Sequence, residues 1–396
     1  MPSRPCWVEI STRNLEDNYR FLKSIAPAGA ELLAIVKADA YGHSLAACGP
    51  AAVRAGARWL GVTSVEEGVR ARAVCPETQI LVMGGVFAGQ GAAIVEHKLA
   101  AAAWEPEQLE ELENAARRAN APAGSVPIHL EIDTGMSRQG VAIADLNEIL
   151  AKFSAGSPLR LNGMMTHLYA SDESNGAATG RQLSCLDQAL HLIEGRPVAP
   201  EWLSAGASAA LLGKEANAIA ALAARRGLKP MLRPGLALYG VIPRYEPPYD
   251  GSDEPPALAR AREALAPVLA WKTRVVSVRE IPAGAEIGYN GTFIATEPMR
   301  LALLAAGYAD GLDRRLGNRF SLLVRGERAP LAGRVSMDQS VIDVTEIPGV
   351  EAGDEVVILG GQGNETVTAF DHADAGGTIP WEVFTRIGVR VPRIEV

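Results

Sequence analysis

A lysine directly follows an apolar run early in the chain, in the stretch AIVKADAYGH, residues 34–43. Such a lysine either marks the solvent boundary of a strand or carries a reactive amine. Burial lowers a lysine pKa from its reference of about 10.4, which makes the neutral and nucleophilic amine accessible. Lys37, with Tyr41 four residues on, is therefore the first candidate for chemistry.

Four further polar positions fall at or near the ends of apolar runs. Arg138 lies in EIDTGMSRQG, His167 closes NGMMTH, Ser208 follows EWLSA, and Arg233 with Gly235 lies in MLRPGLALYG. Singly, each has a structural explanation, because a lone histidine is usually a satisfied structural group and Arg-Pro-Gly is usually a turn. Together they indicate an active site, provided that their strands end on one rim of a barrel.

The common catalytic and metal-binding motifs do not occur. The chain has no GxxxxGK[ST] phosphate loop, no GxSxG elbow and no HExxH. Its six histidines do not pair at metal spacing, and its four cysteines have no CxxC spacing. We therefore expect no metal site and no disulfide framework.

Short apolar runs alternate with helix-like stretches up to about residue 240. Runs of this kind are typical of parallel strands buried on both faces. Eight of them favour a (β/α)₈ TIM-like barrel, with a doubly wound sheet as the alternative. The predicted strands are residues 32–36, 59–62, 79–83, 98–102, 128–132, 162–167, 201–205 and 236–240.

A segment rich in proline and acidic residues, PRYEPPYDGSDEPP at 243–256, interrupts this pattern and is typical of an exposed linker or loop. Beyond it the pattern favours strands separated by turns. We predict an α/β protein with a barrel at 11–242 and a mainly β domain at 243–396, on which residues 1–10 are a candidate to pack. The predicted strands of this domain are residues 271–278, 300–307, 320–324, 340–344 and 355–360.

Composition excludes several classes of function. The 396 residues are 48% hydrophobic and 21% charged, which is ample for a large core and argues against disorder. A net charge of −8 gives no electrostatic case for binding nucleic acid or an anionic membrane. The start of the sequence lacks a signal-peptide core, and no apolar run approaches the roughly 18 residues that span a bilayer. We expect a cytoplasmic protein.

Seven motifs, in order, resemble those of the alanine racemase family of fold-type III pyridoxal phosphate enzymes. They are AIVKADAYGH, DTGMSRQG, MTHLYASDE, RPGLALYG, AAGYADG, GRVSMDQ and RVPRI. The resemblance runs nearly end to end. It implies a barrel with a β domain, pyridoxal 5'-phosphate as cofactor, and conversion of L-alanine to D-alanine for the cell wall.

The resemblance also implies roles for single residues. Lys37 would bind the cofactor covalently and act as one base, and Tyr308 in AAGYADG would be the base on the opposite face. His167 and then Arg233 would stand behind the tyrosine, with Arg233 facing the pyridine nitrogen. The cofactor's phosphate would be held by Tyr41, Ser208 and the backbone at Gly235 and Leu236.

The resemblance further implies a homodimer with shared active sites. Tyr308 and Met337 would then serve the partner's barrel. Arg138 would bind the carboxylate of the amino acid substrate, together with the backbone at Met337.

Two positions depart from the family's pattern. Glu131 stands where a lysine, typically carbamylated, often holds the carboxylate-binding arginine, and Val389 replaces a tyrosine before RVPR. We expect Glu131 to pair with Arg138 and Val389 to widen the entry. These departures leave open a racemase of broader range, acting on serine or lysine. A fold-type III decarboxylase and a non-catalytic cofactor-binding protein are the remaining alternatives.

Overall fold

The computed structural model describes residues 4–250 and 253–396. Residues 1–3, in the predicted N-terminal segment, and 251–252, in the proline-rich segment, lie outside the described residues. The chain forms two compact units. One consists of residues 13–40 and 48–266, and the other of residues 4–12, 41–47 and 267–396. The chain therefore passes between the units more than once.

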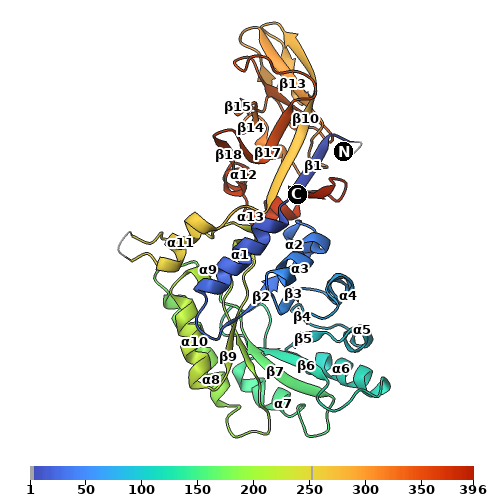
Figure 1. The fold of residues 1–396 in the computed structure, drawn as a ribbon, viewed down its shortest axis with the longest axis vertical. Helices are drawn as coiled ribbons and strands as arrows, with labels where there is room; N and C mark the ends of the chain where they lie inside the picture. The colour runs from blue at the N-terminus through green and yellow to red at the C-terminus, as the bar shows by residue number, and fades with distance from the viewer. Residues whose placement is uncertain (1–3, 251–252) are drawn as a thin grey trace. The chain divides into compact units, whose positions relative to one another are not determined.

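The first unit is built around a closed barrel of eight parallel strands, which confirms the predicted fold class (Figure 1). Strand β2 shows why the sequence favours this arrangement, because all five of its residues are buried, as expected for a strand covered on both faces. The barrel strands are β2 (Glu31–Ile35), β3 (Trp59–Val62), β4 (Gln79–Val82), β5 (Ala100–Ala103), β6 (Val126–Glu131), β7 (Leu159–Met165), β8 (Trp202–Ser204) and β9 (Lys229–Leu232).

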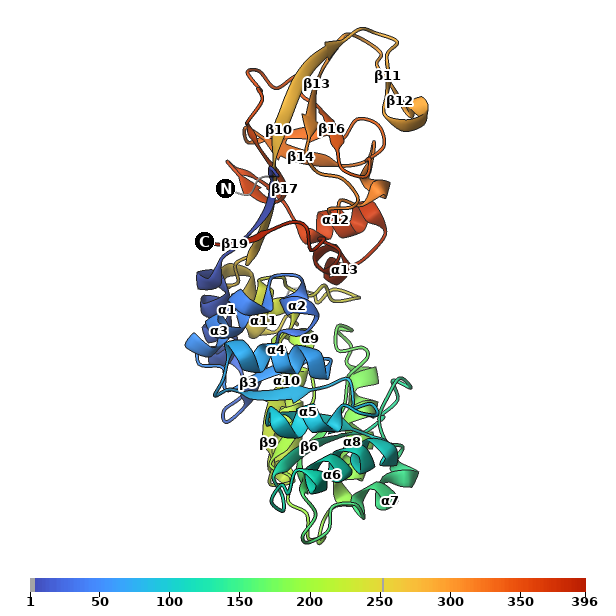
Figure 2. The ribbon, with the colours of Figure 1, turned by 90° about the vertical axis from the view of Figure 1, so that its right-hand side faces the viewer.

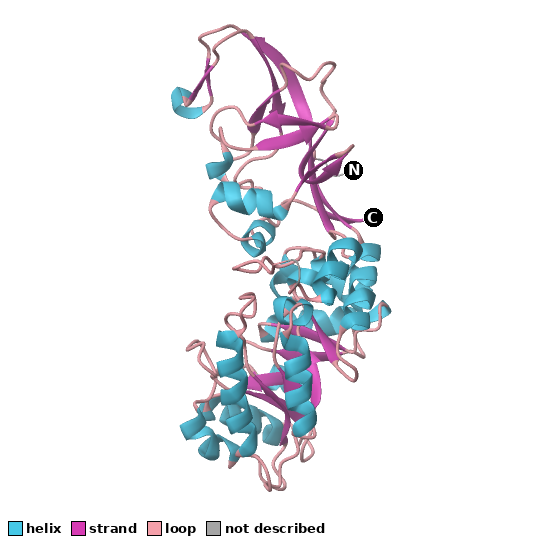
Figure 3. Ribbon diagram, turned by 90° about the vertical axis from the view of Figure 1, so that its left-hand side faces the viewer, coloured by secondary structure: helices cyan, strands magenta, loops and turns pink. Residues whose placement is uncertain are grey.

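Helices connect successive strands of the barrel, as Figure 3 shows by colour. Helix α6 illustrates their design, since Leu109, Leu112, Ala115 and Ala116 recur at helical spacing and are buried. The helices of this part include α1 (Thr12–Ile25), α3 (Leu45–Arg54), α4 (Val65–Val74), α5 (Gly91–Glu96), α6 (Pro106–Arg118), α7 (Leu146–Leu150), α8 (Ala177–His191), α9 (Ser208–Leu212), α10 (Glu215–Arg225) and α11 (Pro256–Ala264).

The eighth strand was predicted in the wrong place. Residues 236–240 are not a strand, because Leu236–Tyr239 form the 3-10 helix η2, which ends at the left-handed Gly240. The strand is instead KPML, β9, which pairs with β8 and β2. Pro230 hides this strand from a pattern search, since proline is usually excluded from central strands. Arg233 therefore follows a strand rather than preceding one.

The second unit contains a nine-stranded sheet, so the predicted β domain is confirmed. Strand β1 (Cys6–Ile10) lies between β10 (Leu269–Ile281) and β19 (Arg393–Glu395) in this sheet. Strand β10 also pairs with β13 (Met299–Leu304), and the small hairpin of β11 (Glu286–Ile287) and β12 (Phe293–Ile294) lies beyond that pair (Figure 2). The remaining elements include β14 (Ser321–Val324), β15 (Glu327–Pro330), β16 (Ser340–Asp343), β17 (Glu355–Gln362), β18 (Glu365–Val367), α12 (Ala369–Gly376) and α13 (Pro380–Thr385).

The proline-rich segment forms a loop that is anchored to the barrel unit. Its Tyr245 is buried, and the hydroxyl donates a hydrogen bond to the carbonyl of Ala209 over 2.6 Å. The amide of Glu246 donates to the carbonyl of Asp172 over 2.9 Å. The segment is therefore held in place at this point rather than being a free linker.

None of the helices in the described residues has the length and apolar character needed to cross a bilayer. No group of three or more histidine, cysteine, aspartate or glutamate side chains within 4–250 and 253–396 could hold a metal ion.

Candidate active site

Five of the residues singled out in the sequence lie just after the C-terminal ends of barrel strands. Lys37 comes two residues after β2, Arg138 lies in the loop after β6, and His167 comes two residues after β7. Ser208 begins α9 after β8, and Arg233 follows β9 directly. The C-terminal ends of parallel barrel strands share one rim, and active sites of such barrels lie there.

The backbone after Lys37 adopts a rare conformation. Ala38, Asp39 and Ala40 have φ angles of 52°, 53° and 57°, and Tyr41 continues with 54°. These are left-handed helical angles, which cost an L-residue about 1–2 kcal/mol each. Strain of this size is kept only where the surroundings enforce it, typically at functional sites.

Glu67 helps to enforce this left-handed turn. One of its carboxylate oxygens accepts a hydrogen bond from the amide of Ala38 over 2.7 Å. The other oxygen accepts from the amide of Thr63 over 2.8 Å, and Ser64 completes a capping box at the start of α4 with Glu67. The side chain therefore fixes the residue after Lys37 to the N-terminus of a barrel helix.

The amine of Lys37 loses its proton more readily than the amine of a surface lysine. Burial lowers its pKa from the ordinary value, and the positive charges of Arg138 and Arg233 lower it further. Among the described residues the amine has no hydrogen-bond partner. A partly desolvated lysine of this kind is a competent base and nucleophile.

Arg233 and His167 form a buried pair. The guanidinium of Arg233, 4% exposed, donates to Ser204 Oγ over 2.9 Å, to the carbonyl of Thr166 over 2.7 Å and to His167 Nδ1 over 3.2 Å. Burial and the charge of Arg233 lower the pKa of His167 to about 3, so the imidazole is neutral. Because its Nδ1 accepts from a guanidinium, which can only donate, the remaining proton lies on Nε2.

Ser208 lies where two backbone amides converge. Its Oγ accepts hydrogen bonds from the amide of Gly235 over 3.0 Å and from the amide of Ala237 over 3.1 Å. These amides belong to the turn that leads from β9 into η2, around Leu236. Because both amides donate to Ser208 Oγ, the hydroxyl proton of Ser208 remains the donor that an anionic oxygen could accept.

Glu131 does not form the expected pair with Arg138. Its carboxylate, 2% exposed, accepts instead from Gln139 Nε2 over 2.7 Å. Burial raises the pKa of Glu131 from its usual value. Arg138 is exposed and has no ion pair within the part of the chain that the structure describes. The prediction was wrong because Gln139 is close enough to satisfy the shorter glutamate arm.

Tyr308 and Met337 belong to the second unit, where two adjacent loops present them to solvent. Their side chains are 42% and 54% exposed. The amide of Tyr308 donates to the carbonyl of Ser336 over 2.9 Å, and the amide of Ala309 donates to the carbonyl of Met337 over 2.9 Å. A Cβ on Gly307 would come within 2.4 Å of the Met337 carbonyl, so this close approach requires glycine.

A buried carboxylate braces these loops. Asp310, fully buried, accepts from Arg4 Nη2 over 2.7 Å, from Arg390 Nε over 2.7 Å and from the amide of Gly307 over 2.9 Å. Arg390 also contacts Asp338 over 2.8 Å. The turn that carries Tyr308 is therefore held from several sides by charge-assisted hydrogen bonds.

Tyr41 also lies in the second unit. Its side chain is buried, and burial raises the pKa of its phenol to about 12, so the hydroxyl is neutral at physiological pH. Its neighbour His43 packs against Phe384 at 4.9 Å between ring centroids.

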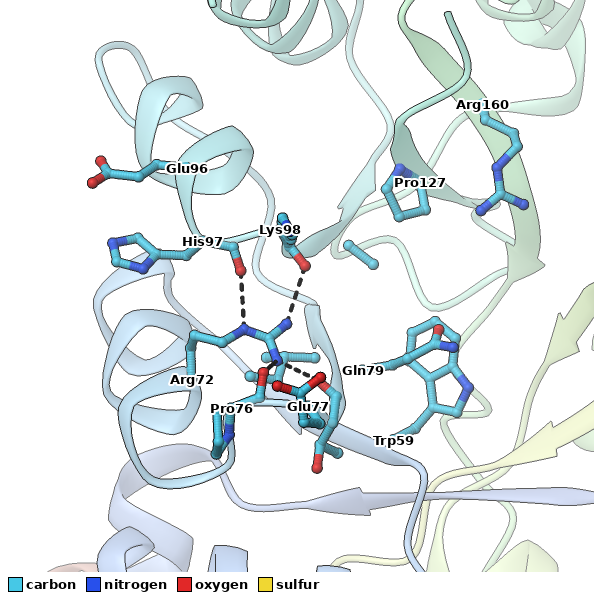
Figure 4. A pocket seen from close by; sticks show the side chains of 13 residues that line it. Trp59, Arg72, Pro76, Glu77, Gln79, Glu96, His97, Lys98, Pro127 and Arg160 are labelled. Atoms are coloured by element: carbon cyan, nitrogen blue, oxygen red, sulfur yellow. Dashed lines mark hydrogen bonds between the residues drawn. The ribbon is translucent and has the colours of Figure 1, made fainter. Parts of the chain in front are cut away.

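A surface pocket of the barrel unit lies at the opposite end of the strands (Figure 4). It is lined by residues at the starts of β3 to β7, among them Trp59, Gln79, Ala100, Pro127 and Arg160. The guanidinium of Arg72 donates hydrogen bonds to backbone carbonyls, including those of His97 over 3.0 Å and Thr78 over 2.6 Å. This end of the barrel is where stability, rather than catalysis, is usually built.

Glu67 and Asp310 were not found by sequence reasoning. The signal for Glu67 was SVEE, which matches a capping box, but only the structure shows its bond to Ala38. Asp310 lies in AAGYADG beside Tyr308, yet its two arginine partners are separated from it by 306 and 80 positions. Neither partner could be assigned from spacing.

Comparisons with known proteins agree with this arrangement. The model of the alanine racemase N-terminal domain matches residues 10–243, and that of the C-terminal domain matches residues 268–395. An alanine racemase of Symbiobacterium thermophilum is 37% identical over 391 residues, which cover 98% of this chain and 97% of the relative.

Solved structures agree as well. The alanine racemase of D-cycloserine-producing Streptomyces lavendulae has a TM-score of 0.88 at 32% identity, over 100% of this chain and 98% of that one. The Bartonella henselae alanine racemase, solved with covalently bound pyridoxal phosphate, shares the fold with a TM-score of 0.82 at 24% identity, over all of both chains. With both domain models matched along nearly its whole length, the chain belongs to the alanine racemase family.

Proposed function

We propose that this protein racemises alanine with pyridoxal 5'-phosphate as its cofactor. The observation that carries the proposal is the grouping of Lys37, Arg233 and His167 at the C-terminal rim of the barrel of an alanine racemase family member. The amine of Lys37 is partly desolvated, and the other two residues form a fixed hydrogen-bonded pair.

The residues present fit this cofactor. The Nε–H of the buried Arg233 makes no hydrogen bond to the described residues, so a donor remains for a ring nitrogen. Ser208 Oγ accepts from the amides of Gly235 and Ala237, on either side of Leu236, so the hydroxyl proton of Ser208 is left to donate to an anion such as a phosphate. The unpaired amine of Lys37 is the group that bonds covalently to an aldehyde. Tyr41 is assigned to the phosphate by the family's pattern.

The proposed mechanism moves one proton at the substrate's Cα between two bases. Pyridoxal phosphate, when bound, stabilises the negative charge that remains at Cα after the proton leaves. Arg138, exposed and without an ion-pair partner among the described residues, binds the substrate carboxylate. Lys37 in its neutral form removes or returns the proton on one face of Cα.

Tyr308 of the partner subunit serves the other face. The neutral His167 supports this role, since its Nε2–H is free to donate to a phenolate oxygen while Arg233 holds Nδ1. Arg233 keeps its charge, because burial lowers its pKa only to about 10. A charged guanidinium donates to a ring nitrogen without protonating it, which limits charge withdrawal and side reactions such as transamination.

The protein is proposed to act as a homodimer with shared sites. The support is that the side chains of Tyr308 and Met337 are exposed on loops that the contacts of Asp310 brace. A location in the cytoplasm remains a prediction from the sequence.

Two measurements test the proposed function. Borohydride reduction of the protein loaded with pyridoxal phosphate, followed by peptide mapping, should attach the cofactor to Lys37. A chiral assay with a panel of L-amino acids should give D-alanine fastest. Attachment at another lysine would refute the role of Lys37, and the absence of D-alanine would refute the activity.

A further inference from the structure

A glutamine in helix α8 is buried next to the site. Gln182 is only 1% exposed, although most glutamines lie on the surface. A buried amide is costly unless its donors and acceptor are all satisfied. Gln182 satisfies them on two loops that follow different barrel strands, the one after β6 and the one after β7.

The partners of Gln182 fix the orientation of its amide. Nε2 donates to the carbonyl of His167 over 2.9 Å, and Oε1 accepts from the amide of Tyr169 over 3.0 Å. A carbonyl can only accept and a backbone amide can only donate, so the reverse orientation is excluded. Gln182 therefore holds the backbone on both sides of Leu168, directly at His167.

The second donor of Gln182 begins a chain of hydroxyl groups. Nε2 also donates to Thr134 Oγ1 over 2.9 Å, and Thr134 Oγ1 lies 2.8 Å from Thr166 Oγ1. Thr166 donates to the carbonyl of Ile132 over 2.9 Å. Its one proton is thus used, and Thr134 must be the donor between the two hydroxyls. Each link is directed and leaves no alternative pairing.

This chain connects the two loops that carry the proposed substrate contacts. Thr134 belongs to the Arg138 loop, defined here as residues 133–140. Within that loop Asp133 Oδ1 accepts from the amides of Gly135 and Ser137 over 2.9 and 3.1 Å. At the other end of the chain the carbonyl of Thr166 accepts from Arg233.

We propose that Gln182 is a positioning residue for the racemisation proposed above. It holds the Arg138 loop and His167 at a fixed separation through its contacts with Thr134, the His167 carbonyl and the Tyr169 amide. Because the loop carries the carboxylate-binding arginine and His167 supports a base, Gln182 sets the substrate's orientation relative to the two bases without touching the substrate or the reacting atoms.

The test compares the same substitution at two glutamines of helix α8. Gln182→Glu keeps the shape of the side chain but replaces the NH₂ group by a carboxylate oxygen. That oxygen faces the His167 carbonyl and cannot donate a hydrogen bond to it. Gln188→Glu, at an exposed position of the same helix, is the control. Misplacing the substrate by about 1 Å slows a reaction roughly 10²-fold. We therefore expect kcat/KM for alanine, per cofactor-loaded site, to fall by about that factor in Gln182→Glu and to stay unchanged in Gln188→Glu.

A second measurement does not depend on activity. Acetate, a carboxylate that cannot react, should protect Arg138 from phenylglyoxal, as followed by mass spectrometry of the Arg138 peptide. Gln182→Glu should need about tenfold more acetate for the same protection, which corresponds to about 1.4 kcal/mol of lost carboxylate binding. A purely structural residue would lower the melting temperature and leave kcat/KM per loaded site and acetate protection unchanged.

The outcomes separate this proposal from the proposed function. If Gln182→Glu matches Gln188→Glu in both measurements, the positioning role is wrong. If Gln182→Glu does not fold, Thr134→Val and Thr134→Ser replace it. The valine variant should then lose kcat/KM and acetate protection, whereas the serine variant should keep most of both. Equal behaviour of the two variants would refute the proposal. A wild-type protein without racemase activity would instead refute the proposed function, while acetate protection still tests Gln182.

Discussion

Replacing Ala38 with glycine should stabilise this protein, against the usual direction of such a change in a helix. Ala38 has φ 52° and ψ 48°, which are left-handed angles. Its side chain is exposed, so its methyl group buries no area that glycine would lose. Its amide bond to Glu67 does not involve the side chain and is kept.

The size of the effect follows from two opposing contributions. A left-handed conformation costs an L-residue about 1–2 kcal/mol, and glycine avoids this cost. Glycine loses more backbone entropy on folding, which costs about 0.5–1 kcal/mol. The free energy of unfolding should therefore rise by about 0.75 kcal/mol, the difference between the midpoints of these two estimates. At about 2–4 °C per kcal/mol for a domain of this size, the melting temperature should rise by about 1–4 °C.

The control is Ala221→Gly, at an exposed position inside the regular helix α10. It should lose about 1 kcal/mol, the ordinary cost of glycine in a helix. Thermal and urea unfolding followed by circular dichroism, on cofactor-free protein, compares the two variants. Equal losses in both would show that residue 38 is not left-handed in solution. We also expect Ala38→Gly to be a slower enzyme, because a looser turn positions Lys37 less precisely.

Four other changes have defined outcomes. Mixed Lys37→Ala and Tyr308→Phe proteins, each inactive alone, should regain racemase activity through hybrid dimers, and no recovery after verified subunit exchange would exclude shared sites. Asp310→Ala should lower the free energy of unfolding, measured by urea titration, by about 3 kcal/mol. This is the lower end of the range for buried ion pairs, because both arginines are partly exposed. A loss below about 1 kcal/mol would contradict the bracing role of Asp310. Val389→Tyr should raise the ratio of kcat/KM for alanine over serine, because the fully exposed valine leaves open the entry that a tyrosine would narrow. An unchanged ratio would show that Val389 does not affect substrate selection. Burial raises the pKa of Glu131, so the folded protein holds this proton more tightly and the free energy of unfolding falls as pH rises above the unfolded pKa. Glu131→Gln should weaken this fall in unfolding titrations between acidic and mildly alkaline pH. An unchanged profile would show that Glu131 is not the cause.

The sequence alone predicts most of the fold and places the candidate site on the correct rim. Continuous apolar runs such as residues 32–36 mark barrel strands, because both of their faces are covered. The pattern fails at β9, where Pro230 interrupts a short strand and the apolar run LALYG beyond it forms η2 instead. Periodicity alone does not separate a short strand from a buried helical turn.

The site's supporting contacts were beyond sequence reasoning for a different reason. Glu131 was matched to Arg138 on charge, but the structure pairs it with Gln139, since distance and side-chain length decide between neighbours. Gln182 carries no charge and stands in an ordinary amphipathic helix. Only its burial, which depends on the packing of α8 against the barrel, distinguishes it from Gln188.

The position of β1 has a consequence for how the protein is made. Cys6–Ile10 pairs with β10 on one side and with β19 on the other, and β19 ends one residue before the last. During synthesis this strand leaves the ribosome before both of its neighbours, which follow about 260 and 385 residues later, at roughly 5–20 residues per second. For many seconds both of its edges are unpaired, and an apolar strand with open edges is a template for aggregation. The first strand of the chain is therefore the segment that we expect a chaperone to protect during synthesis.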